Sequence, residues 1–175
     1  MITTIKSKKF ILRPFRKGDE FSLAKNINNK KVIKNLLVVP SPYKLKDAQN
    51  WVVKNLSEYK KKEPAMIGFA IDIGGEVVGS VGVHKIVRSH QAEIGYWLAE
   101  QHWGNGIMTE AVKLITKLSF NELKLKRVYA YAFSFNKASQ KVLAKAGFKF
   151  EGILKKNSKK GDKFIDDYLF AKIRT

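Results

Sequence analysis

A short loop with two glycines near the middle of the chain could bind a phosphate group. The loop reads Gln101-His102-Trp103-Gly104-Asn105-Gly106. It follows an alternating run from 93 to 98, typical of a strand, and precedes an amphipathic run from Ile107 to about Phe120, typical of a helix. Backbone N–H groups that converge at a helix N-terminus suit a phosphate or pyrophosphate, because the helix dipole adds positive potential there. We therefore predict an anion-binding turn in this loop.

Two other phosphate-binding patterns do not fit this loop. A dinucleotide-binding fold needs Gly-x-Gly-x-x-Gly after a strand of a parallel sheet, whereas the strands expected before this loop form a meander. A Walker loop ends in Gly-Lys-Ser or Gly-Lys-Thr, and the loop lacks that ending.

A second polar segment, Asn136-Lys137-Ala138-Ser139, opens a helix after a strand expected at 128–132. Taken alone it is a helix cap, with Asn136 at the N-cap, worth about 1 kcal/mol. Its position about 30 residues after the glycine loop makes a functional role worth considering together with that loop.

Together these segments resemble the GCN5-related N-acetyltransferase (GNAT) superfamily. Residues 93–98 with Gln101-x-x-Gly104-x-Gly106 resemble its fourth strand and acetyl-CoA pyrophosphate loop. Asn136-x-x-Ser139, followed by Val142-Leu143-x-x-Ala146-Gly147-Phe148, resembles its second cofactor-binding segment. The match is most similar to the branch that acetylates N-terminal alanine or serine of ribosomal proteins, and it covers about Phe10 to Ile173. It implies acetyl-CoA as cofactor and one N-acetyltransferase domain over residues 1–175.

The resemblance also implies which residues bind the cofactor. A backbone N–H near Leu98 or Ala99 would meet the oxyanion, where the family's strand splays from its neighbour. The expected cofactor-binding residues are Leu98, Ala99, Gln101, Trp103, Gly104, Asn105, Gly106, Ile107, Met108 and Asn136.

Acetyl transfer to an amine needs a neutral amine, a polarised thioester carbonyl and a proton for the leaving thiolate. Glu93 matches the glutamate of the ribosomal-protein branch and is the expected base. Ser139 matches that branch's proton donor, whereas the tyrosine that many other members use is replaced by Leu143. Tyr131 and Tyr168 are further candidates for this donor. His84, His90 and His102 match no motif position and are not spaced like a metal site, so we expect neither a catalytic histidine nor a metal.

Hydrophobic periodicity and turn residues predict a mixed α/β fold, and the resemblance implies that it is the GNAT fold. It has a mixed, mostly antiparallel sheet of about seven strands with about four helices, in the order β-α-α-β-β-β-α-β-α-β-β. Asp47 is expected to cap the helix that carries Trp51 and Val52. The expected strands are 10–15, 66–73, 77–83, 91–98, 128–132, 148–154 and 164–173. The four expected helices are 18–28, one over 47–59, 107–120 and 136–146, and a short additional helix is expected around 31–36.

Composition limits the function classes. The 175 residues carry a formal net charge of +19 with no cysteine. Without cysteine, disulfides and thiolate metal sites are excluded. No apolar run spans a membrane and no secretory h-region opens the chain, so we expect a soluble, cytoplasmic protein, monomeric or homodimeric. The charge fits a lysine-rich compositional bias, steering of a polyanionic cofactor, or nucleic-acid association.

The acceptor stays open at this point. The N-terminal α-amine of a protein, ribosomal proteins included, is the leading candidate. A polyamine, an aminoglycoside or an amino-acid-like amine is the alternative, although only 15 acidic residues face 34 basic ones. Asp166 and Asp167 could join Glu93 in a local acidic pocket. A basic module that binds RNA or ribosomes is a third possibility, with nucleic acid otherwise contacted only by nonspecific charge.

Overall fold

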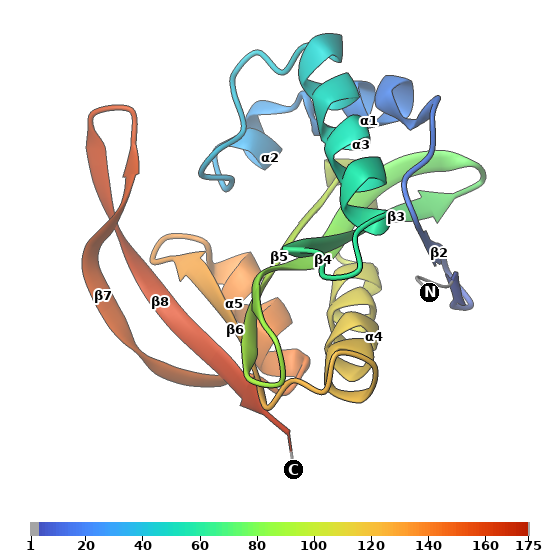
Figure 1. Ribbon diagram of the computed structural model, residues 1–175. Helices are drawn as coiled ribbons and strands as arrows, with labels where there is room; N and C mark the ends of the chain where they lie inside the picture. Colours follow the sequence, from blue (N-terminus) through green and yellow to red (C-terminus); the bar gives the residue numbers. More distant parts are fainter. Residues whose placement is uncertain (1–3, 175) are drawn as a thin grey trace.

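The computed structural model describes residues 4–174 and contains one eight-stranded sheet with helices on both faces (Figure 1). The strands lie side by side in the order β1-β2-β3-β4-β5-β6-β8-β7. The strands are β1 (Ile5–Lys6), β2 (Ile11–Arg13), β3 (Met66–Ile73), β4 (Glu76–Val87), β5 (Gln91–Leu98), β6 (Arg127–Phe133), β7 (Lys149–Lys160) and β8 (Lys163–Ile173). The helices are α1 (Asp19–Ile27), α2 (Lys30–Ile33), α3 (Leu45–Tyr59), α4 (Ile107–Asn121) and α5 (Lys137–Lys145), with a 3₁₀ turn at Glu100–His102.

The sheet opens between β5 and β6. All other neighbouring strands pair antiparallel, but these two are parallel and share only three residue pairs, from Gln91–Arg127 to Glu93–Tyr129. Beyond Glu93 and Tyr129 the two strands have no paired residues in the described chain. The splay expected near Leu98 or Ala99 therefore begins earlier, after Glu93, and it creates an opening through the sheet.

Alternation along β5 sends its side chains to two separate cores. Ile94 and Leu98 pack into the larger core beneath α4 and α5. Trp97, on the opposite face, packs against the smaller core beneath α1 and α3. In Figure 1 these two groups of helices lie below and above the sheet respectively. Glu93 shares the face of Trp97, so the opening joins two chemically distinct sides.

The hairpin β7–β8 is longer than the sequence predicts. The lysine-rich segment 155–160, expected as a loop, continues β7 after a bulge between Leu154 and Ser158. Lys156 takes a left-handed φ of 51°, and its N–H donates to Asp166 Oδ1 at 2.8 Å. This tertiary contact, which no local pattern encodes, keeps β7 paired with β8.

The end of this hairpin is tied to α2. Lys160 Nζ donates to the carbonyl oxygens of Ile33 and Leu36, each at 2.5 Å, and burial lowers the pKa of the amine. Figure 1 shows the hairpin rising toward α2 at the left of the molecule. The tether joins two segments more than 120 residues apart in the chain.

The predicted fold class is confirmed, and the differences are local. The structure has an eighth strand, the two-residue β1, which pairs with β2. The short helix expected around 31–36 is α2, at Lys30–Ile33. Asp47 is not the cap of α3: Lys44 is, and Asp47 reaches back from the first turn so that its Oδ2 accepts from Lys44 N–H at 2.8 Å. None of the helices within 4–174 is long and apolar enough to cross a membrane.

Candidate active site

A large open cleft runs through the splay between β5 and β6. Its volume is about 1510 Å³, more than the few hundred to about 1,000 Å³ of a typical small-ligand pocket. One end is formed by the glycine loop and the N-termini of α4 and α5. The other end lies between α2 with its following loop and the hairpin β7–β8. The cleft therefore has room for two substrates that meet at the splay.

The glycine loop places an uncapped helix N-terminus in the cleft. Gly104 and Gly106 have φ of 79° and 75°, in the left-handed region that glycine adopts at no steric cost. Gly106 is the N-cap of α4, and no side chain caps that end of the helix. The first N–H groups of α4 are thus free to bind an anion, which fits the pyrophosphate of coenzyme A.

Most of the predicted cofactor-binding and catalytic residues come together in this cleft. Those that line it are Glu93, Leu98, Trp103, Gly104, Gly106, Ile107, Met108, Asn136 and Ser139.

Three predicted cofactor-binding residues do not line the cleft. Ala99 is fully buried and its N–H donates to Val78 O at 2.8 Å, so it has no free donor for an oxyanion. The Gln101 amide donates to Asn26 Oδ1 at 3.2 Å and anchors the loop to α1. Asn105 is exposed, and Lys9 Nζ donates to its carbonyl oxygen at 2.8 Å. The contacts of these three residues with neighbouring segments hold the loop in place. The backbone N–H of Leu98 remains the candidate donor to the oxyanion.

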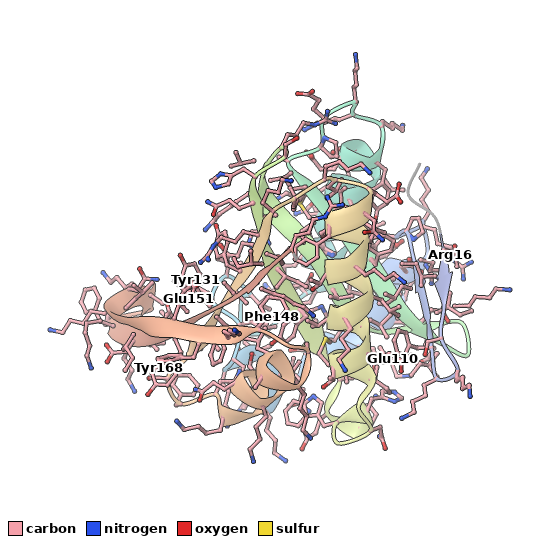
Figure 2. The ribbon with its side chains drawn as sticks, turned by 90° about the horizontal axis from the view of Figure 1, so that it is seen from below. Arg16, Glu110, Tyr131, Phe148, Glu151 and Tyr168 are labelled. Atoms are coloured by element: carbon pink, nitrogen blue, oxygen red, sulfur yellow. The ribbon has the colours of Figure 1, made fainter. Side chains whose placement is uncertain are left out.

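The cleft is predominantly basic. Its acidic residues are Glu93, Glu110 and Asp167. Figure 2 shows Glu110 at the end of α4 nearest the N-terminal strands, where its Oε1 accepts from Ser7 Oγ at 2.7 Å. The lysines that line the cleft are Lys31, Lys34, Lys85, Lys113, Lys137, Lys141 and Lys145. Lysines on α4 and α5 surround the uncapped helix end, as a polyanionic cofactor requires.

Ser139 has a hydroxyl partner that the sequence reasoning missed. Tyr96 Oη lies 2.8 Å from Ser139 Oγ, and Ser139 N–H donates to Asn136 Oδ1 at 3.1 Å. Asn136 is thus the N-cap of α5 as well as a cleft residue. Burial raises the pKa of Tyr96, although the contact with Ser139 lowers it slightly, and the phenol stays protonated at neutral pH. Alternation in β5 puts Tyr96 on the face opposite Glu93, and this was the available sequence signal.

Glu93 lies at the other side of the opening and contacts two cations. His84 Nε2 is 3.3 Å from Oε1, and Lys85 Nζ is 2.9 Å from Oε2. Burial alone raises the pKa of Glu93, but the His84 and Lys85 contacts outweigh it, and the pKa lies below its ordinary value. The sequence reasoning did not expect His84 in the site.

Tyr131 and Tyr168 occupy different environments. Tyr131 is exposed and lines the cleft. Tyr168 instead packs against Phe150 and the main core, on the hairpin that Figure 2 shows extending away from α4. Asp167, in β8 of the hairpin, is buried, and its Oδ2 accepts from Asn157 Nδ2 at 2.8 Å and from Ser158 Oγ at 2.6 Å. Asp166 instead pairs with Lys155 outside the cleft, so of the two aspartates only Asp167 lines the same cleft as Glu93.

Comparison with known proteins agrees with this geometry. The family model of the acetyltransferase (GNAT) domain matches residues 9–149. The chain is 39% identical over 124 residues to the probable N-acetyltransferase YjcK of Bacillus subtilis (strain 168), covering 67% of this chain and 68% of that protein. It is 32% identical over 99 residues to the ribosomal-protein-serine acetyltransferase of Escherichia coli (strain K12), covering 56% and 55% of the two chains.

A solved structure shows the same fold over nearly the full length. RimL, a ribosomal L7/L12 α-N-protein acetyltransferase in complex with coenzyme A, superimposes with a TM-score of 0.87 at 22% identity, covering 98% of each chain. Members of the GNAT family take their acetyl group from acetyl-CoA. Since the family model spans most of the chain, the protein belongs to the GNAT family and is an N-acetyltransferase that uses acetyl-CoA.

Proposed function

We propose that the acceptor is the N-terminal α-amine of a protein, of the ribosomal-protein type, and that it attacks the donor directly in a ternary complex. The observation that carries this proposal is the character of the acceptor end of the cleft. Exposed apolar side chains, Leu37, Val38 and Phe135, line it beside few carboxylates. An extended peptide that buries its first side chains suits such a surface, whereas a polyamine or aminoglycoside needs several carboxylates to bind its charges.

The glycine loop at residues 101–106, called the donor turn below, and the acceptor end of the cleft meet at the splay. Bound acetyl-CoA supplies a thioester whose carbonyl carbon is the electrophile. The uncapped α4 N-terminus and the lysines of the cleft hold the anionic end of the donor, and Leu98 lies in the part of β5 that no longer pairs with β6. In the proposed donor pose the acetyl group lies at the splay, which within residues 4–174 is the only opening between the two faces of the sheet.

Proton transfer is divided between the two faces. The acceptor amine loses its proton on the side of Glu93, which we propose as the anionic group that promotes this step. Ser139 donates a proton to the leaving thiolate, and Tyr96, whose phenol is 2.8 Å away, holds Ser139 Oγ in position and can replace its proton. The two groups lie on opposite faces, so neither needs to change role during one turnover.

Free coenzyme A can be measured directly, because the chain has no cysteine to react with a thiol reagent. The protein is incubated with acetyl-CoA and one acceptor from a panel of peptides with N-terminal Ser or Ala, spermidine and kanamycin. We expect thiol release with the peptides and none with the same peptides acetylated at the N-terminus. Faster release with spermidine or kanamycin than with every peptide would move the acceptor to small amines.

A further inference from the structure

Two consecutive residues of β4 reach the same carboxylate, which a regular strand does not allow. Neighbouring side chains of a strand point to opposite faces. The pairing of β4 with β5 is interrupted between His84 and Val87, and Lys85 has a left-handed φ of 51°. As a result both His84 and Lys85 contact Glu93. Bulges of this kind re-aim side chains beside active sites, and a strained non-glycine residue is a reason to look for function.

The imidazole of His84 extends from Glu93 toward the splay. A Cβ built on Gly95 would lie 3.2 Å from His84 Cε1 and 3.7 Å from Nδ1, so the ring lies over Gly95. Gly95 is two residues beyond Glu93 in β5, at the level where β5 and β6 no longer pair. The side chain of His84 is 40% exposed and that of Glu93 only 14%. The histidine is therefore the more accessible member of the pair for a second substrate.

The two ring nitrogens of His84 have different surroundings. Nε2 faces the Glu93 carboxylate, which favours the tautomer with its proton on Nε2. Nδ1 then carries the lone pair, and the polar contact of the ring within residues 4–174 is the one that Nε2 makes with Glu93. A general base needs this arrangement: a free lone pair toward the substrate and a carboxylate behind the ring.

We propose that His84 is the general base that deprotonates the acceptor amine, and that Glu93 orients its ring and stabilises the imidazolium. This inference rests on the proposed function. The acceptor enters as an ammonium group, and one N–H proton passes to His84 Nδ1 and then to solvent. The freed nitrogen lone pair forms the C–N bond, the C–S bond breaks, and its electron pair leaves with sulfur. The sulfur takes a proton from Ser139 Oγ, and the second N–H proton of the amine restores that lost proton through solvent.

The other charged and titratable groups around His84 fit this division of work. Lys85 holds Glu93 in its ionised form, which is the form that accepts a hydrogen bond from Nε2–H of His84. Tyr129 and Tyr131 of β6 lie on the side of Glu93 and Lys85, while the β3 residue opposite His84 is the apolar Met66. Glu93 is thus the sole carboxylate in the described chain that pairs with His84.

The kinetic test uses His84→Gln with His90→Gln as its matched control. His90 is an exposed histidine in the turn before β5 that does not line the cleft. With the best N-terminal Ser or Ala peptide as probe, His84→Gln should lower kcat/KM by roughly 10²-fold or more. It should also remove the acidic limb of the kcat/KM pH profile, and His90→Gln should keep the wild-type rate and that limb. Added imidazole should partly restore the rate of His84→Ala. A His84→Gln rate within about twofold of wild type, with the limb intact, would overturn the proposal.

A spectroscopic test of the wild-type chain does not depend on turnover. The wild-type chain has three histidines, so ¹⁵N-labelled imidazole signals can be assigned with single variants. We expect His84 in the Nε2–H tautomer, with its signals moved by Glu93→Gln and those of His90 unmoved. A proton on Nδ1 in the neutral ring would overturn the base role. If acetyl-CoA binds but none of the amines in the panel gives thiol release, the proposed acceptor is rejected. The tautomer measurement would still decide on His84.

Discussion

Replacing Gly106 with alanine should separate the strain of the donor turn from its binding role. Gly106 has φ 75° and ψ 0°, and a left-handed conformation costs an L-residue about 1–2 kcal/mol. An added Cβ meets nothing closer than Lys9 Nζ at 3.9 Å, so packing adds no further cost. If the turn keeps its shape, the free energy of unfolding falls by that amount. A domain of this size then loses about 2–4 °C in Tm for each kcal/mol.

The same strain can appear in binding instead. If alanine relaxes to a negative φ in the free protein, acetyl-CoA must restore the left-handed turn when it binds. The loss of binding free energy is then at most the same 1–2 kcal/mol, so the Kd rises by about tenfold. The losses in unfolding and binding free energy should therefore add to about 1–2 kcal/mol. Gly106→Asn should lie between glycine and alanine, because asparagine enters the left-handed region more readily.

Urea unfolding of the free protein and calorimetric titration with acetyl-CoA measure the two parts. Gly161→Ala is the matched control, since Gly161 has φ 58°, no neighbour within 4 Å and a position in the β7–β8 turn. That variant should lose stability but keep wild-type affinity. The reasoning fails if Gly106→Ala loses neither quantity, or if Gly161→Ala loses as much affinity.

Four further substitutions test other parts of the site. Ser139→Ala should lower turnover by roughly 10²-fold. Tyr96→Phe should lower it by up to about tenfold, because Ser139 Oγ loses its partner at 2.8 Å. Wild-type rates for both variants in steady-state assays would mean that water protonates the thiolate. Lys85→Met should raise the pKa of Glu93, whose lowered value in the folded state stabilises the protein above the unfolded pKa. The free energy of unfolding of Lys85→Met, measured in urea, should therefore be lower than that of wild type at pH 7. The difference should shrink as the pH falls through the folded pKa of Glu93, and a difference independent of pH would contradict this. Lys160→Met should raise the peptide KM severalfold and leave the acetyl-CoA Kd unchanged, since the tether closes the acceptor end alone; a matching rise in Kd would count against it.

The parts of the fold that local chemistry determines could be predicted from the sequence. β3 and β5 begin and end at the predicted residues, because each is a dense apolar or alternating run with turn residues at its ends. The turn at Gly74-Gly75 has positive φ at both residues, as a hairpin of this kind requires. The start of α4 at Ile107 follows from Gly106 in the same way.

The parts that the sequence did not predict depend on long-range contacts. Nothing in the residue types shows that Lys85 and Lys156 adopt left-handed conformations, since lysine has no local preference for them. His84 faces Glu93 as its regular cross-strand partner, whereas the bulge at Lys85 turns that lysine to the same carboxylate, and the bulge at Lys156 extends β7. Gln101 fits the family motif, yet its contact with Asn26 of α1 appears only when helix and loop are packed together.

The tether of Lys160 to α2 and the loop after it allows the two ends of the cleft to evolve independently. The donor end is built from β5, α4 and α5, whereas the acceptor end is built from α2, its loop and the β7–β8 hairpin. These acceptor segments are held to each other by a lysine and two main-chain carbonyl groups, which remain whatever side chains occupy positions 33 and 36. Substitutions in the acceptor wall can therefore accumulate without disturbing either the tether or the donor turn. A lineage with this scaffold can change its acceptor while it keeps its acetyl donor.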